Sequence, residues 1–156
     1  MGGDQEVEVL SGVSDQGYRW LVEAGGSDDD FMTMLRLFDG ARRVFGGGMG
    51  GPKLYPGTVI HESRNRKDDL PYVLVARTAP HIDRVVATTD LGFEIVLPLS
   101  GVIDQFGLRF AAAVLPDGQG PGSIRAESQG QVIHTARRSM PRRAPGGAGW
   151  LPADRG

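Results

Sequence analysis

Apolar and polar side chains alternate along much of the chain, which is the pattern of half-buried β-strands. In 18–24, for example, the alternation places Tyr18, Trp20 and Val22 on one face. The segments in which we expect strands are 18–24, 72–77, 82–87, 93–97, 108–112, 124–127 and 131–134. The middle of 72–77 is apolar on both faces, which predicts a central strand.

Turn sequences separate these segments. Residues 90–92 and 116–118 combine Asp with Gly, and the second turn adds Pro, so both supply the backbone conformations that tight turns need. Short strands with turns every 8–12 residues or so are typical of a sandwich or barrel. We therefore expect an all-β protein, a two-layer antiparallel sandwich that is immunoglobulin-like in its general architecture.

Residues 31–45 fit two different structures. Their large apolar residues fall at helical spacing, with acids at 28–30 available as N-caps and Gly46 as a stop. Against a helix, Asp39-Gly40 divides the segment as a hairpin turn would, and a mid-helix Gly costs about 1 kcal/mol relative to Ala. The hairpin is the favoured interpretation.

The chain divides into a folded part and two ends. Residues 1–15 are expected to be an acidic disordered segment, and 16–136 to be the sandwich domain. Residues 137–156 are rich in Arg, Pro and Gly and hold too few apolar side chains to offset the entropy of ordering, which predicts a disordered tail. The Gly-rich stretch 46–57 is expected to be a loop, and the 24 Gly and 10 Pro of the chain agree with many turns.

Charge and cysteine content narrow the function classes. The net charge is −2, so no global field attracts nucleic acid or an anionic membrane, although the first 30 residues are acidic and the tail is basic. The absence of cysteine excludes disulfides and thiolate-bound metals and agrees with a reducing compartment. Because the sequence contains neither a long apolar run nor a signal-peptide pattern, we expect a cytoplasmic protein without a membrane span.

Several short segments together form a recurring pattern: Trp20-Leu21, Asp39-Gly40, the Gly-rich 46–51, Arg77-Thr78-Ala79-Pro80-His81-Ile82-Asp83-Arg84-Val85, Phe110 to Pro116, Gly120-Pro121 and 126–132. In these segments the chain resembles a group of β-sandwich modules found in Gly- and Arg-rich actinobacterial-type proteomes. Ile82 and Val114 depart slightly from the pattern of the group. The resemblance covers about residues 18–134 and implies a sandwich fold. No chemistry is assigned to the group, so the resemblance implies no catalytic residues.

Motifs for cofactors and metals are weak. Gly46-x-Gly48-x-x-Gly51 matches a dinucleotide fingerprint only formally, because prolines follow it where a helix would have to start. The acids at 28–30 lack the alternating spacing of a calcium loop, so they are expected to form a solvated turn. The histidines His61, His81 and His134 lack zinc-ligand spacing. We therefore assign no cofactor and no metal.

Motifs for catalysis and nucleic-acid binding are equally weak. No Gly-x-Ser-x-Gly motif occurs, and the candidate acids Glu62 and Glu94 show no defined geometric relation to each other. The basic cluster of the tail has no interleaved aromatic residues for stacking on bases, which does not favour nucleic-acid binding. Acid–base chemistry is unsupported by the sequence, and whether the protein is an enzyme stays open.

The sequence favours a noncatalytic protein-interaction or regulatory module with an unidentified protein partner and an undetermined oligomeric state. The alternative is a small-ligand binder or hydrolase whose site forms only in the fold. The residues expected to contact a partner are Met49, Leu54 and Tyr55 on the Gly-rich loop and Arg137, Arg138, Arg142 and Arg143 in the tail.

Overall fold

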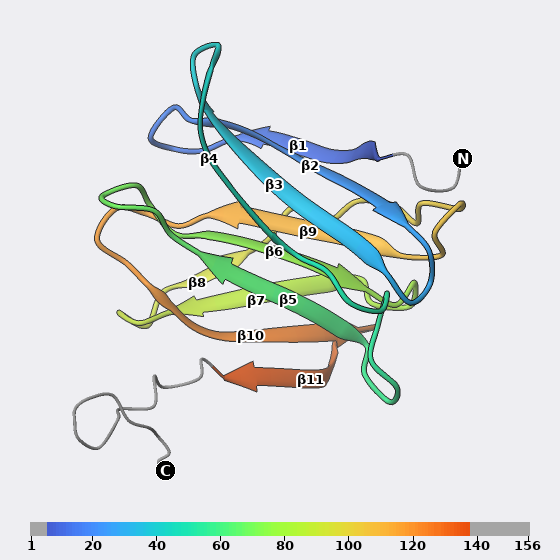
Figure 1. Ribbon diagram of the computed structural model, residues 1–156. Helices are drawn as coiled ribbons and strands as arrows, with labels where there is room; N and C mark the ends of the chain where they lie inside the picture. The colour runs from blue at the N-terminus through green and yellow to red at the C-terminus, as the bar shows by residue number, and fades with distance from the viewer. Residues whose placement is uncertain (1–5, 138–156) are drawn as a thin grey trace, which may run out of the picture.

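The computed structural model describes residues 6–137, and within them the chain forms β-strands and no helix (Figure 1). The strands are β1 Val7–Val13, β2 Arg19–Gly26, β3 Phe31–Asp39, β4 Arg42–Met49, β5 Ile60–Asn65, β6 Val73–Thr78, β7 Arg84–Thr89, β8 Glu94–Val96, β9 Arg109–Val114, β10 Pro121–Ser128 and β11 Gln131–Arg137. Every pairing between them is antiparallel. The sheets have the strand orders β1-β2-β3-β4, β5-β6-β9 and β11-β10-β7-β8.

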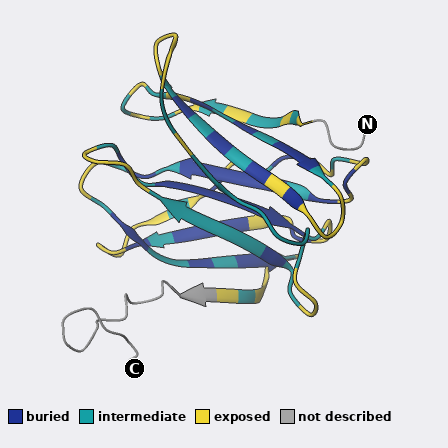
Figure 2. Cartoon of the chain, in the orientation of Figure 1, coloured by how far each residue is buried: buried dark blue, intermediate teal, exposed yellow. Residues whose placement is uncertain are grey.

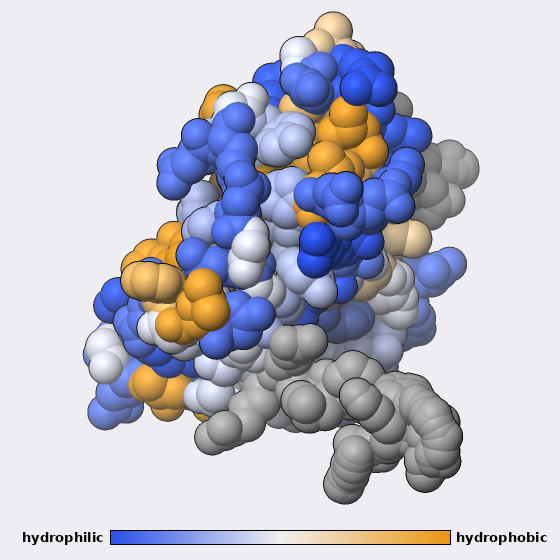
Figure 3. Space-filling model, turned by 90° about the vertical axis from the view of Figure 1, so that its left-hand side faces the viewer, coloured by the Kyte–Doolittle hydropathy of each residue, from blue (hydrophilic) through white to orange (hydrophobic). Residues whose placement is uncertain are grey.

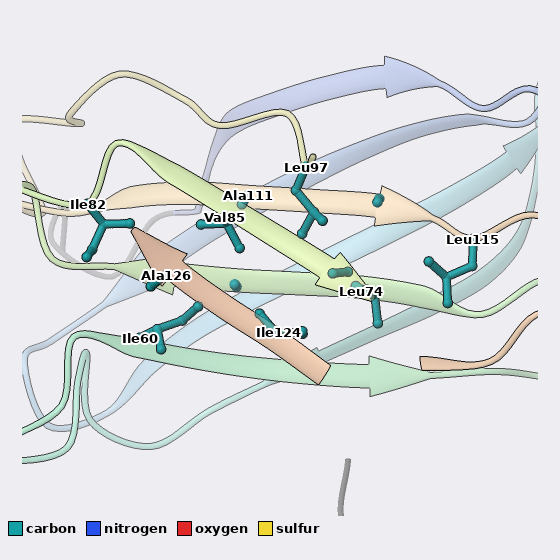
Figure 4. Packing of buried hydrophobic residues seen from close by; sticks show 12 residues of the cluster. Ile60, Leu74, Ile82, Val85, Leu97, Ala111, Leu115, Ile124 and Ala126 are labelled. Carbon is teal, nitrogen blue, oxygen red and sulfur yellow. The ribbon is translucent and has the colours of Figure 1, made fainter. Parts of the chain in front are cut away.

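The sheet β5-β6-β9 lies between the other two. One of its faces packs on β2 and β3 through Val22, Leu35, Val73 and other buried residues. The opposite face packs on β7 and β10, and Figure 4 shows side chains of the two sheets, among them Leu74, pointing toward each other. The expected all-β antiparallel sandwich is confirmed, and its strands are divided among three sheets.

Strand β6 shows why this sheet is central. All of its residues are buried, as the dark strands in the middle of Figure 2 show. Val73 and Val75 contact the β1–β4 side, whereas Leu74 and Ala76 contact the β7–β10 side. The neighbouring strand β9 carries Ala111–Ala113, whose small side chains let both outer sheets approach. The expectation of a central strand at 72–77 is confirmed.

The core between the central sheet and β7–β10 consists mainly of aliphatic side chains that pack against one another (Figure 4). Leu74 and Ile124 are at most 1% exposed. Truncating a side chain such as Leu74 to alanine removes this packing at about 2–5 kcal/mol. Two smaller clusters, one around Trp20 and one around Phe31, fill the space beneath β1–β4.

Residues 31–45 form the expected hairpin, so the helical alternative is wrong. Strands β3 and β4 pair from Thr33↔Met49 to Asp39↔Arg42. Gly40 in the connecting turn has a φ of 63°, a left-handed conformation that glycine adopts without steric cost. The helical spacing of the apolar residues was coincidental, because in the structure alternate residues of β3 face the core.

Two expectations about segment boundaries are corrected. Val7–Val13 lies in the segment expected to be disordered, yet it forms β1 against β2. A register shift between Glu8 and Leu10 breaks the period of two, so the pattern does not read as a strand. The expected disorder of 1–5 and 138–156 lies outside the described residues, and Arg137, expected to open the tail, ends β11.

Only part of the Gly-rich segment 46–57, which was expected to be a loop throughout, lies outside a strand. Gly46–Met49 belong to β4, where a Cβ at Gly47 would lie 2.8 Å from Asn65 Cβ, so glycine permits the close approach of β4 and β5. Strand β5 was not expected, because its sequence after Ile60 is polar and has no alternation. Within the described residues no helix has the length and apolar character to cross a membrane.

Candidate functional site

Because successive strands run in opposite directions, every second turn of the chain lies at the same end of the sandwich. The turns β1–β2, β5–β6, β7–β8 and β9–β10 lie on the left in Figure 1, and we call this region the loop end. Figure 3 views the molecule from this side, where hydrophilic residues cover most of the surface and hydrophobic residues gather in separate places. Loops at one end of a rigid sandwich are a common location for binding residues.

A pocket of about 400 Å³ opens at the loop end. Its lining comes from all of these turns and consists of Tyr18, Arg66, Asp69, Leu70, Pro71, Tyr72, Asp90, Asp117, Gly118, Gln119 and Gly120. We call it the loop-end pocket. Its volume lies within the range of roughly 300–1,000 Å³ that small-molecule sites occupy.

One side of the loop-end pocket is an arginine stacked on a tyrosine. The Arg66 guanidinium carbon lies 5.2 Å from the ring centroid of Tyr72. Arg66 Nε also donates hydrogen bonds to the carbonyl oxygens of Asp68 and Leu70, each at 3.1 Å. The β5–β6 loop is thereby held against the sheet, and Asp68 adopts a left-handed φ of 51° in its turn.

The carboxylates of the loop-end pocket differ in how far they are engaged. Asp90 Oδ1 accepts a hydrogen bond from the Gly120 amide at 3.0 Å, which joins the β7–β8 and β9–β10 turns. Asp117 Oδ1 accepts one from Gln16 Nε2 at 3.2 Å. None of these carboxylates, Asp69 included, takes part in an ion pair within residues 6–137.

Gln119 has a polar atom without a partner. Its Oε1 is buried, and nothing in the described part of the chain donates a hydrogen bond to it. A buried acceptor without a donor costs about 1–3 kcal/mol. Within residues 6–137 this lining residue therefore keeps an unused acceptor.

A second polar centre lies inside the sandwich, around Arg77 on β6. Arg77 is 0% exposed, and it takes part in no ion pair among residues 6–137. Its donors bind the segment that follows β4: Nε donates to the Lys53 carbonyl at 2.7 Å, and Nη2 donates to the carbonyls of Gly50 at 2.8 Å and Pro52 at 2.7 Å. Nη1 donates to Thr33 Oγ1 at 2.8 Å.

This arrangement satisfies a buried charge with carbonyl dipoles. Burial lowers the pKa of the Arg77 guanidinium to about 10, so it remains charged at neutral pH. Because guanidinium donors are fixed in a plane, Arg77 sets the path of residues 50–53 from the inside of the fold. Its donors are taken up by the carbonyls of the segment after β4 and by the Thr33 hydroxyl, so we assign it a structural role.

His61 and Tyr55 extend this centre toward the surface. Arg77 Nη2 lies 3.1 Å from His61 Nδ1. Burial lowers the pKa of His61, and the nearby Arg77 charge lowers it further. The Tyr55 ring meets the His61 ring edge to face, with centroids 5.1 Å apart.

The three loop residues expected to contact a partner differ in how far they are exposed. The carbonyl of Met49 lies 3.4 Å from Arg77 Nη1, and Leu54 packs against the Phe31 cluster, so both belong to the interior arrangement. Tyr55 is 50% exposed and is the member of this group that presents a large surface. Nothing is described of the Arg137 side chain, and Arg138, Arg142 and Arg143 lie outside the described residues.

The weaker candidate motifs also have structural explanations. Gly46 and Gly48 lie in β4, and no helix follows them up to residue 137, so the geometry that a dinucleotide requires is missing there. Asp28 pairs with Lys53 at 2.8 Å in the turn after β2. His61, His81 and His134 do not gather, since no group of metal-binding side chains exists within residues 6–137.

The candidate acids are held by arginines on different sheets. Glu62 pairs with Arg64 at 3.0 Å, and Glu94 pairs with Arg125 at 2.9 Å. The hydrogen bond and charge of Arg125 lower the pKa of Glu94, which makes it a poor proton donor. Neither glutamate lines the loop-end pocket.

Sequence reasoning missed the loop-end pocket because its lining is scattered over four turns. Asp90 and Asp117 were read as turn residues, which they are. Nothing in their spacing along the chain indicates that they share a cavity. Comparison with family models, curated proteins and solved structures finds no match to this chain.

Proposed function

We propose that this protein is a noncatalytic binding module that takes a small polar ligand in the loop-end pocket. The observation that carries the proposal is the cavity of about 400 Å³ at the place where turns from all three sheets converge. A concave site on a rigid scaffold is the usual form of a small-molecule site. The proposal adopts the ligand-binding alternative that the sequence left open, without its hydrolase branch.

The lining chemistry supports binding over catalysis. The pocket is lined by tyrosine, aspartate, arginine and glutamine side chains and by main chain, and no serine or histidine is among its residues. A serine, threonine or cysteine nucleophile next to a base, a common arrangement for hydrolysis by covalent catalysis, is not among these lining residues. Aromatic faces with polar groups around them are instead suited to holding a polar ligand.

A protein-interaction module is the second candidate, and a separate observation favours it. Leu91, Phe93 and Val96 are 64%, 59% and 53% exposed at the β7–β8 turn and on β8. Strand β8 is an edge of its sheet, so its outer main-chain groups are available for pairing. In this second proposal, a protein partner binds at the β8 edge. We propose a cytoplasmic location for either function.

The test is a titration of the ¹⁵N-labelled full chain with small polar molecules of several charge classes. We expect at least one class to shift the amide signals of residues 66–72 and 117–120 in a saturable way. Leu70→Trp, which adds bulk to the lining, should abolish the shifts. The control Val102→Trp changes an exposed residue that is not part of the lining and should leave them intact. Binding that survives Leu70→Trp would refute the pocket as the site.

A further inference from the structure

The charges in the loop-end pocket are unbalanced. Three carboxylates, those of Asp69, Asp90 and Asp117, line it together with one arginine, Arg66. Arg66 is engaged by the β5–β6 loop, through the carbonyls of Asp68 and Leu70 and the face of Tyr72. The carboxylate charges of the pocket are therefore not neutralised by a neighbouring ion pair in residues 6–137.

Several glutamates elsewhere in the fold are instead paired with an arginine. Glu62, Glu94 and Glu127 are each held by an arginine at 3.0 Å or less. In the loop-end pocket, Asp90 and Asp117 accept only uncharged donors, from the Gly120 amide and the Gln16 side chain. The fold thus places uncompensated negative charge around a cavity, which favours a ligand of opposite charge.

The two tyrosines add a second kind of preference. Tyr18 and Tyr72 both contribute to the lining. Aromatic faces attract organic cations through the ring quadrupole, typically by about 0.5–1 kcal/mol at exposed sites. A polyol would also stack on these rings, but it gains nothing from the net negative charge.

The spacing of the carboxylates argues against a metal ion. A hard cation needs oxygen ligands that converge on one point about 2.3–2.6 Å away. Within the described chain no three acidic or imidazole groups lie close enough to hold a metal, so the aspartates surround the cavity without converging. Dispersed carboxylates fit a cation whose charge and donors are spread over several atoms.

We infer that the ligand of the loop-end pocket carries a positively charged, multi-donor organic group, a guanidinium or an alkylammonium. The carboxylates of Asp69 and Asp117 accept its N–H groups, and the Tyr18 ring contacts its alkyl or planar part, since Arg66 already lies over the Tyr72 ring. The inference rests on the proposed function, because it assigns a ligand class to the same pocket.

The test compares two probes of the same shape that differ in charge. Butylguanidine carries a planar cation, and N-butylurea carries the neutral planar equivalent; myo-inositol represents the polyols. We expect butylguanidine to shift the amide signals of 66–72 and 117–120 of the full chain at concentrations at least tenfold lower than N-butylurea or myo-inositol. Raising NaCl from 50 to 500 mM should weaken its binding severalfold.

Paired variants identify the carboxylates. The double variant Asp69→Asn with Asp117→Asn should weaken butylguanidine binding about tenfold, since each exposed ion pair contributes up to about a fivefold factor. The control double variant Asp29→Asn with Asp104→Asn makes the same change in net charge at exposed aspartates that do not line the pocket, and it should change binding less than twofold.

The source of the cation can be a free molecule or an arginine of this chain, since residues 138–156 include Arg138, Arg142, Arg143 and Arg155. Replacing these four residues with glutamine distinguishes the sources. Tighter butylguanidine binding in that variant assigns the site to the chain's own arginines, and unchanged binding assigns it to a free molecule. Both results support the guanidinium class.

The results distinguish a wrong ligand class from a pocket that binds no ligand. Equal or tighter binding of N-butylurea or myo-inositol in the pocket would overturn the cationic class while supporting the pocket as a ligand site. An equal loss in both double variants would overturn the role of Asp69 and Asp117. If no probe of any charge shifts the loop-end signals of the folded chain, the proposed function itself fails.

Discussion

Replacing Arg77 with methionine removes the donors that hold the segment after β4, and it leaves the acceptors in place. The carbonyls of Gly50, Pro52 and Lys53 and the hydroxyl of Thr33 each lose a hydrogen bond of 2.8 Å or less. Methionine fills part of the space but donates nothing. Replacing both partners of a buried ion pair with apolar groups often leaves the free energy of unfolding unchanged. Arg77→Met differs because it removes only the donors and leaves the acceptors unpaired.

The magnitude follows from these acceptors. An acceptor left unsatisfied in a buried position costs about 1–3 kcal/mol. Residues 50–53 are only half-buried, so water reaches some of the carbonyls and the lower end of this range applies. Four acceptors then give a loss of about 4 kcal/mol in the free energy of unfolding, a large share of the roughly 5–15 kcal/mol typical of a domain.

The assay is equilibrium urea unfolding followed by far-ultraviolet circular dichroism. Arg77→Lys keeps the charge but offers fewer donors in a different geometry, so we expect an intermediate loss of about 2 kcal/mol and a measurable transition even where Arg77→Met does not fold. The control is Arg109→Met on the neighbouring strand β9, because Arg109 donates an exposed hydrogen bond to the Pro80 carbonyl. Its loss should stay below about 1 kcal/mol. A loss for Arg77→Met no larger than that of Arg109→Met would refute the reasoning.

Further substitutions test other parts of the fold. The lowered pKa of His61 means that the unfolded chain binds its proton more readily than the folded one, so stability should fall as the pH drops below about 6.5 and level off below the folded-state pKa. His61→Gln should flatten this part of a pH series of urea midpoints; an unchanged profile would exclude His61 as its source. Gly48→Ala should cost about 1–3 kcal/mol, because its Cβ would overlap a β3 carbonyl, whereas Gly101→Ala, with open space around it, should be near neutral in thermal unfolding. Gln119→Met should leave the melting temperature unchanged or raise it, since the buried acceptor disappears, and a clear decrease would show that Oε1 has a partner.

Several elements could be predicted because their signals are local. The alternation in 18–24 and the doubly apolar 72–77 correspond to β2 and β6, and Asp39-Gly40 to the turn between β3 and β4. Strand β5 gave no such signal, because its side chains bond to neighbouring main chain, as Ser63 does to the Gly48 carbonyl, and do not fill an apolar face. Strand β1 was hidden by its register shift.

By itself, the sequence determined the strand-rich class and most turns, since side-chain period and turn propensity act between residues close along the chain. The tertiary structure decided which charges are buried and which share a cavity. In the sequence, Arg77 is one more polar residue at the end of a strand. Its role is visible only in the fold, where it donates hydrogen bonds to the carbonyls of Gly50, Pro52 and Lys53. Asp90 and Asp117 were predicted only as turn residues, and the antiparallel connections bring their turns to the same end of the sandwich as Asp69. Such long-range proximity depends on how the sheets stack, and stacking is specified by the whole core and not by any local segment.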